Sequence, residues 1–435
     1  MNPIFEKTRK LFCLLAALSI ISMTFLPASG MPAARVNVLG RTAFVSDAVV
    51  REWNLIAFTT IPAPPPFPAT RAMAIVQLAV FEAVNAITGR YEPYLSTINA
   101  PPGASPEAAA IMAAHGVLVA LVPSQASFLN QRRDASLALI PDGQAKIDGI
   151  QVGMAAAAAM LANRANDGSS PATFHVPPNS DPYQWQTYAG CPTGGGAFFN
   201  WQNVTPFGIE SSSQFRAEPP PPLESGMYAQ DFNELQNMGG VNSAFRPQDR
   251  TDVARLYAVA GPPNLWNAVL LQILSTRNDD ITDTARTMAL LNMAVGDAAI
   301  SVFDSKYHYR TWRPITAIPR GGDDGNIRTT AGAFTPLITT PCFPAYPSAH
   351  GTLSNAALQI LELTYGRFGH SLSIEHPSLP GLILYYSDLR EIGADISDAR
   401  VYGGIHFRFD QVAGERQGDA VAGYIFSNLL QRRRL

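Results

Sequence analysis

The sequence predicts an all-α protein on two observations. Apolar residues recur at helical spacing over most of the chain, and long alternating strand patterns are absent from the sequence. Hydrophobic residues make up 47% of the 435 positions and charged residues 15%, which is typical of a globular protein with a sizeable core. A Gly-, Pro- and aromatic-rich stretch, 168–225, separates the helical groups 69–167 and 229–430. We therefore expect two helical bundles packed together.

The N-terminus has the pattern of a secretory signal. Basic residues precede an apolar run over 11–25, and small residues at 28–30 offer a cleavage site. The other interpretation is a membrane anchor, but about 15 apolar residues are short for a membrane span. We expect residues 1–30 to be removed and the protein to be secreted, either periplasmic or extracellular.

Charge and cysteine content limit the partners. Removal of residues 1–30 changes the formal net charge from −3 to −5, which argues against nucleic acid or an anionic membrane as the main partner. Beyond the signal no 18 apolar residues follow one another, so we expect no stable membrane insertion. Cys191 and Cys342 would remain, and an oxidising compartment permits a disulfide without requiring one.

The first half of the mature chain begins with an expected arm or linker, 31–68, which ends in a proline run. An N-terminal helical region, 69–228, follows, with helices expected over 72–85, 108–122 and 145–166. Asp167-Gly168 is a helix stop signal. We expect the stretch 168–225 to be an ordered excursion, because a structureless loop of that length is unusual inside a compact domain.

The second half, 229–430, should contain short helices over 229–238, 249–260 and 266–275. A longer helix is expected from about Thr284. Its inward-facing stripe would carry Lys306 and Arg313, and Pro314 would end or kink it.

Three motifs within 306–410 carry the most specific chemical signal. They read K-x6-RP from Lys306, PSAH from Pro347 and R-x5-H-x3-D from Arg400. Lysine is rare here, with four in the chain, so one retained near an arginine is informative. A compact ammonium and a planar guanidinium together suit a tetrahedral oxyanion. The competing interpretation pairs these cations with buried carboxylates such as Asp297 or Asp304.

The second motif precedes an apolar stretch of helical spacing, 353–363, which places it at a helix N-terminus. Free N–H groups there attract oxyanions. Ser348 and the Ala349 N–H are candidate donors, and His350 is a candidate acid–base group.

In the third motif, Gly403-Gly404 lies between Arg400 and His406 and allows the backbone to bend. Asp410 follows His406 by four residues and could accept a hydrogen bond from its second ring nitrogen. The competing interpretation is an ordinary surface helix.

These motifs resemble the signature of the vanadium-dependent haloperoxidases and the type 2 phosphatidic-acid phosphatases, which share one fold and one anion pocket. The usual pattern is K-x6-RP, PSGH and SR-x5-H-x3-D, so Ala349 replaces a glycine and Ala399 a serine. If the family's glycine has a positive φ, alanine would be strained. The stretches 306–318 and 343–348 resemble the haloperoxidase branch. The resemblance implies helical bundles of the vanadium chloroperoxidase type, with 229–430 as the catalytic domain.

The resemblance also implies roles. Vanadate or phosphate would be bound by Lys306, Arg313, Ser348, Ala349 and Arg400. His406 would be the vanadium ligand, His350 would move protons, and Asp410 would orient His406.

Three functions follow from the resemblance. The preferred one is a vanadate-dependent peroxidase that oxidises halide with hydrogen peroxide and halogenates a small organic acceptor. Phe343 favours chloride weakly. The second is a secreted, metal-free acid phosphatase with a phospho-histidine on His406 and with His350 protonating the leaving group. The third is a non-enzymatic anion-binding protein, supported by Ala349 and Ala399.

Overall fold

A computed structural model describes residues 44–63, 65–96 and 98–433. These residues are mainly helical, so the all-α prediction is confirmed. The expected signal and the first part of the expected arm lie outside them. The N-terminal α-helices are α1 (Ala48–Thr60), α2 (Pro66–Thr88), α3 (Pro106–Leu121), α4 (Ala126–Ala138) and α5 (Gln144–Asn163). The C-terminal α-helices are α6 (Gly226–Met238), α7 (Gln248–Val259), α8 (Pro262–Ser275), α9 (Ile281–Tyr309), α10 (Pro314–Ala317), α11 (Ala349–Tyr365), α12 (Leu389–Tyr402) and α13 (Arg408–Asn428).

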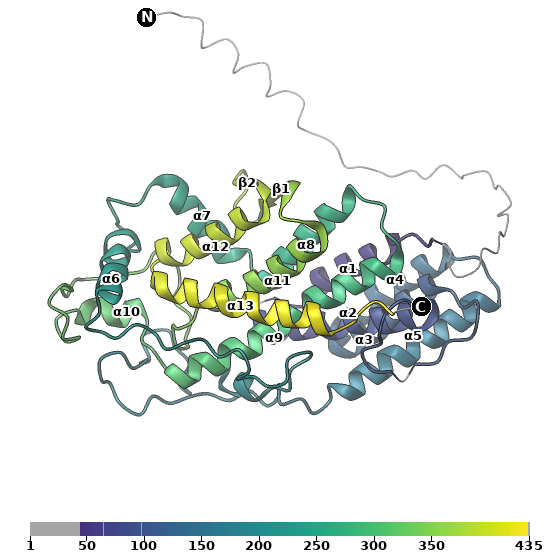
Figure 1. The fold of residues 1–435 in the computed structure, drawn as a ribbon, viewed down its shortest axis with the longest axis horizontal. Helices are drawn as coiled ribbons and strands as arrows, with labels where there is room; N and C mark the ends of the chain where they lie inside the picture. The colour runs from purple at the N-terminus through teal and green to yellow at the C-terminus, as the bar shows by residue number, and fades with distance from the viewer. Residues whose placement is uncertain (1–43, 64, 97, 434–435) are drawn as a thin grey trace, which may run out of the picture. The chain divides into compact units, whose positions relative to one another are not determined.

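The longest helix, α9, packs against α2, α11 and α13, and Figure 1 shows it at the centre of the helical array. Its contact with α2 joins the N-terminal and C-terminal helical groups, which share one continuous apolar core. A smaller aromatic cluster, which includes Tyr228, Trp312 and Phe407, lies beside the motif residues. The N-terminal and C-terminal helical groups thus meet along α2 and α9.

Helices α2, α5 and α9 have the length and hydropathy of membrane spans. In α2 and α9, however, 89% and 100% of the apolar window is buried inside the protein. The composition of these two helices is therefore explained by their place in the core.

Two helices were missed in the N-terminal half. Helix α1 lies inside the segment expected to be an arm, and it buries Val50, Trp53 and Phe58 against the core. Helix α4 follows α3 after a single 3-10 turn, Pro123–Gln125. Its largely exposed, polar sequence gives little periodic signal.

The excursion 168–225 is ordered, with one 3-10 helix, Phe199–Asn203. The disulfide left open by the sequence forms between Cys191 and Cys342, whose Cα atoms are 5.4 Å apart. Ala197 N–H also donates to Cys342 O at 2.8 Å. The excursion is therefore attached to the loop that leads into the second motif.

The first motif does not lie on one helix, so that expectation was wrong. Helix α9 ends at Tyr309, because Arg310 adopts the left-handed conformation with φ 54°. Arg313 is the N-cap of α10, and Pro314 occupies the first turn, where a missing N–H costs nothing. Lys306 remains in the last turn of α9.

A two-stranded antiparallel hairpin, β1 (Phe368–Glu375) and β2 (Ile383–Asp388), was also missed. The alternation of buried and exposed side chains in this hairpin covers only a few residues: in β1 the side chains of Leu372 and Ile374 are buried while Glu375 is exposed. The hairpin packs on α8 and α12, near their labels in Figure 1.

Candidate oxyanion-binding active site

The three motifs converge on one buried site. It is assembled from the end of α9, the start of α10, the N-terminus of α11, the end of α12 and the loop into α13. Five ionisable motif residues are at most 2% exposed: Lys306, Arg313, Arg400, His406 and Asp410. Hydrogen bonds between motifs connect Arg313 with His406 and Arg400 with His350.

Arg313 is fixed by neighbouring backbone. Its Nε donates to Phe343 O at 2.8 Å, and its Nη1 donates to Ile405 O and to His406 Nε2, both at 2.9 Å. Its Nη2 is buried without a hydrogen-bond partner among the residues that the structure describes. One edge of the guanidinium is therefore held by protein, and a nitrogen on the other is left for a ligand.

Arg400, in the last turn of α12, has even fewer protein partners. Its Nη1 donates to His350 Nε2 over 3.4 Å. Within 44–63, 65–96 and 98–433, nothing accepts a hydrogen bond from its buried Nε or Nη2. Buried polar groups are nearly always satisfied, so these nitrogens indicate a bound acceptor.

Lys306 is arranged differently from the prediction. Its ammonium donates to the carbonyl oxygens of Pro344, Ala345 and Pro347 at 2.9, 2.7 and 2.5 Å. An ammonium has three N–H bonds, and all three are used here. Lys306 therefore fixes the loop before the second motif and contributes its charge to the site.

The carboxylates of the competing interpretation have other partners. Asp297 accepts from the N–H groups of Phe207, Gly208 and Ile209, at 2.6 to 2.8 Å. Asp304 forms a two-point ion pair with Arg216 at 2.7 and 2.9 Å. They therefore do not neutralise the motif cations.

The second motif begins α11 as expected. Ser348 is the N-cap, and its Oγ accepts from Gly351 N–H at 3.2 Å while its hydroxyl proton remains available. Ala349 is the first helical residue and is not among the positive-φ positions. Alanine in place of the family's glycine is consequently unstrained here.

The third motif orients His406. Its Nδ1 lies 2.7 Å from Asp410 Oδ2, which also accepts from Phe407 N–H at 3.1 Å. Because Arg313 can only donate, His406 Nε2 must be the acceptor, and the ring proton lies on Nδ1. The Nε2 lone pair is thus presented inside the site, as a metal ligand or a nucleophile requires.

Gly404 shapes the loop that carries His406. Its φ is 81°, and a Cβ there would lie 2.3 Å from Gly239 O. Only glycine fits, because both the backbone conformation and the close approach exclude a side chain.

The cations destabilise one another. The pKa of Arg400 is lowered to about 9, and the pKa of Lys306 falls well below 10.5. In both cases burial is the largest cause and the charge of Arg313 is the second. Burial lowers the pKa of His350 and His406 well below 6.5, with the cations adding to the effect. Burial raises the pKa of Asp410 to about 7 against the opposing charges of Lys306 and Arg313.

These observations fit a tetrahedral oxyanion such as vanadate. Three buried cations face one carboxylate among the described motif residues, and an anion would supply the missing negative charge. The three guanidinium nitrogens without partners would supply its hydrogen bonds. His406 Nε2 would provide the bond to the metal.

The remaining histidines do not join this site. His308 is exposed, and His115 contacts Asn130. His175 packs beside Tyr307, and His370 contacts Gly366 O.

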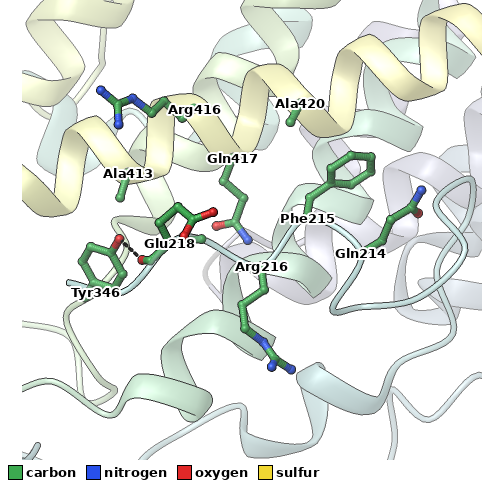
Figure 2. A pocket seen from close by; sticks show the side chains of 10 residues that line it. Gln214, Phe215, Arg216, Glu218, Tyr346, Ala413, Arg416, Gln417 and Ala420 are labelled. Atoms are coloured by element: carbon green, nitrogen blue, oxygen red, sulfur yellow. Dashed lines mark hydrogen bonds between the residues drawn. The ribbon is translucent and has the colours of Figure 1, made fainter.

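A cavity of about 280 Å³ lies between α13 and the excursion. Figure 2 shows Gln417 of α13 extending toward the 214–218 segment, and Tyr346 donating to Glu218 O. None of the residues that we assign to the oxyanion site lines it.

A larger cavity, of about 860 Å³, is lined by His350 together with residues of α7, α8 and β1. The sequence did not reveal it. Its walls come from segments more than 100 residues apart in the sequence, and His376 is one of the residues that line it.

Comparisons with known proteins agree with the motif resemblance. Residues 286–433 match the family described as VCPO second helical-bundle domain. The vanadium chloroperoxidase of Curvularia inaequalis is 30% identical over 190 residues, which are 36% of this chain and 31% of that protein. The chain thus spans about a third of this relative's length.

Solved structures extend the likeness in fold. A bacterial vanadium-dependent iodoperoxidase superposes with a TM-score of 0.73 at 24% identity, covering 89% of this chain and 97% of its own. A holo-type bacterial vanadium-dependent chloroperoxidase superposes with a TM-score of 0.68 at 17% identity, and the match covers 85% of this chain and 93% of that chain.

The fold is therefore that of the vanadium-dependent haloperoxidases, and the resemblance predicted from the motifs is confirmed. Residues 286–433, which match the VCPO second helical-bundle domain, carry all three motifs.

Proposed function

We propose that this protein is a vanadium-dependent haloperoxidase that oxidises halide with hydrogen peroxide at a vanadate held by the three motifs. The observation that carries the proposal is the buried site itself: three guanidinium nitrogens of Arg313 and Arg400 lack acceptors among the described residues, and the unprotonated Nε2 of His406 lies 2.9 Å from Arg313 Nη1. The family match of residues 286–433 and the chloroperoxidase relative favour this reaction over ester hydrolysis.

Each side chain has a distinct task. Arg313 and Arg400 hold and neutralise the oxyanion, Ser348 and the N-terminus of α11 donate to it, and Lys306 fixes the loop 344–347. His406 is the metal ligand, and Asp410 keeps its proton on Nδ1.

His350 acts as the proton carrier. It is neutral at neutral pH because burial and the nearby cations lower its pKa, so it can accept a proton from incoming peroxide. Vanadate, when bound, supplies a Lewis acid that activates hydrogen peroxide toward the halide.

A phosphatase would use the same pocket with His406 as the nucleophile. The deciding experiment compares peroxide-dependent oxidation of chloride, bromide and iodide by vanadate-loaded protein with phosphomonoester hydrolysis by the metal-free form. Halide oxidation without appreciable hydrolysis supports the proposal. Hydrolysis with a phospho-enzyme trapped on His406, and no halide oxidation, would establish the phosphatase instead.

We also propose that the protein is exported. The Cys191–Cys342 disulfide supports this, because such bonds persist in oxidising compartments. Intact-mass measurement should find a mature N-terminus near Met31. Retention of residues 1–30 would refute the cleavage.

A further inference from the structure

A buried carboxylate from α6 caps the helix that follows His406. Asp231 is 6% exposed, and its Oδ2 accepts a hydrogen bond from Phe409 N–H at 2.7 Å. Phe409 lies in the first turn of α13, where backbone N–H groups lack partners within the helix. The N-cap of α13 is Phe407, whose side chain has no oxygen that could accept from them. Asp231, which is 178 residues away in the sequence, supplies an acceptor instead.

Aromatic packing holds α6 against this turn. Tyr228 and Phe232 of α6 belong to the same buried cluster as Phe407 and Phe409. The rings of Phe407 and Phe409 stack with centroids 5.1 Å apart, and Tyr228 lies 5.8 Å from Phe407. Figure 1 shows α6 beside the end of α13 at which this helix begins. The carboxylate is therefore held at a helix N-terminus, where the positive end of the helix dipole stabilises it.

The first turn of α13 also carries the residue that orients the proposed metal ligand. Asp410 follows Phe409 directly, and its Oδ2 lies 2.7 Å from His406 Nδ1. The backbone oxygen of Asp410 accepts a hydrogen bond from Ser348 N–H, at the N-cap of α11, at 2.8 Å. A displacement of this turn would therefore move both His406 and Ser348.

We propose that Asp231 is a positioning residue for the oxyanion site: its hydrogen bond to Phe409 N–H fixes the turn that carries Asp410. Through Asp410 it sets the direction of the His406 ring and the place of Ser348. The inference rests on the proposed function, in which His406 is the vanadium ligand. Groups that orient a metal ligand typically change metal affinity about 10- to 100-fold. Asp231 acts one step further from the metal, so we expect an effect at the lower end of this range, about tenfold.

Two variants of Asp231 separate its hydrogen bond from its charge. Asp231→Leu has a side chain of comparable size without an acceptor, and it should bind vanadate about tenfold more weakly than wild type. Asp231→Asn keeps an oxygen that can accept from Phe409 N–H, and it should bind vanadate at least as tightly as wild type. If Asp231 acted through its charge alone, both variants would bind vanadate more tightly, because each removes a negative charge from beside the third motif.

Glu234→Gln is the matched control. Glu234 lies three residues after Asp231 on α6, and its carboxylate accepts a hydrogen bond from the Arg408 side chain at 2.6 Å. It therefore contacts the same turn through a side chain and not through a backbone N–H. Arg408 keeps a second partner, Asp398, at 2.6 Å. This variant should retain wild-type vanadate affinity.

Calorimetric titration of the full-length, anion-free proteins with vanadate at about pH 8 measures these affinities. Burial raises the pKa of Asp231 to about 6, so its carboxylate is ionised under these conditions. Thermal unfolding of each variant establishes that it is folded at the temperature of the titration. If Asp231→Leu does not fold, Asp231→Ala, which introduces no larger group, takes its place.

Weaker vanadate binding in Asp231→Leu, with binding retained in Asp231→Asn and Glu234→Gln, supports the inference. Wild-type affinity in Asp231→Leu, even with a lower melting temperature, would leave Asp231 as a structural helix cap and overturn it. Equal weakening in Asp231→Asn or Glu234→Gln, or tighter binding in both Asp231 variants, would also overturn it. Halide oxidation is measured separately. Its absence in wild type would overturn the proposed function, whereas a selective loss of vanadate affinity in Asp231→Leu would still establish the positioning role.

Discussion

Substitution of Arg400 by methionine tests whether the Arg400 guanidinium binds an anion or stabilises the fold. Two buried nitrogens of Arg400, Nε and Nη2, lack an acceptor among the described residues. A hydrogen bond to a charged group contributes about 1.5–3 kcal/mol, so two of them amount to about 3–6 kcal/mol. Vanadate or phosphate should therefore bind roughly 10²- to 10⁴-fold more weakly to Arg400→Met.

The anion-free protein should respond in the opposite direction. Burial and Arg313 lower the pKa of Arg400 to about 9, which means that the charge is unfavourable in the folded state without an anion. Removing it should leave the free energy of unfolding unchanged or raise it. Anion addition should then stabilise wild type much more than the variant.

Arg250→Met is the matched control. Arg250 of α7 donates to Asp395 and Asp398 of α12, the helix that carries Arg400, at 2.7 and 3.1 Å. Its loss should lower the free energy of unfolding without changing anion affinity. Calorimetric titration with vanadate and thermal unfolding with and without vanadate measure both quantities. Wild-type anion affinity in Arg400→Met, or a loss of stability in the anion-free protein as large as that of Arg250→Met, would contradict an anion-binding role for Arg400.

Three further predictions concern the other parts of the site. Lys306→Met should weaken vanadate binding and also lower the free energy of unfolding by about 3 kcal/mol, since it leaves three buried carbonyls unsatisfied; unchanged urea unfolding would contradict this. Below pH 6, anion-free wild type should lose about 1 kcal/mol of unfolding free energy per pH unit relative to His350→Gln. Burial, followed by the charge of Arg400, keeps the pKa of His350 in the folded protein below its unfolded value of 6.5, so the unfolded chain binds the His350 proton first as the pH falls. If the unfolding free energies of wild type and His350→Gln changed equally with pH, this prediction would be refuted. Cys342→Ser should lower the free energy of unfolding by about 2–5 kcal/mol, because the disulfide closes a long loop; an unchanged melting temperature in non-reducing buffer would argue against it.

The sequence was most informative where chemistry requires particular residue types at fixed spacing. The His406–Asp410 contact follows from a four-residue separation, and the place of Ser348 at a helix N-terminus follows from the apolar stretch after it. Helical periodicity also identified α9, because one side of a core helix must be apolar.

What the sequence could not predict depends on backbone conformation and on distant partners. The end of α9 is set by the left-handed conformation of Arg310, a residue type with no preference for it, and so Arg313 was assigned to the wrong element. The carbonyl partners of Lys306 lie 38 to 41 residues away. The cavity beside His350 depends on the hydrogen bonds between Gln272 and Ser373, 101 residues apart.

The most direct test of the account is the vanadium content of two variants after equilibrium dialysis against vanadate. His406→Ala should lose bound vanadium, because it removes the proposed metal ligand that Asp410 orients. His350→Ala should keep a substantial part of the affinity while losing halide oxidation, because His350 contacts Arg400 and carries protons. Equal loss of vanadium in both variants, or full retention in His406→Ala, would contradict the assignment of ligand and proton carrier.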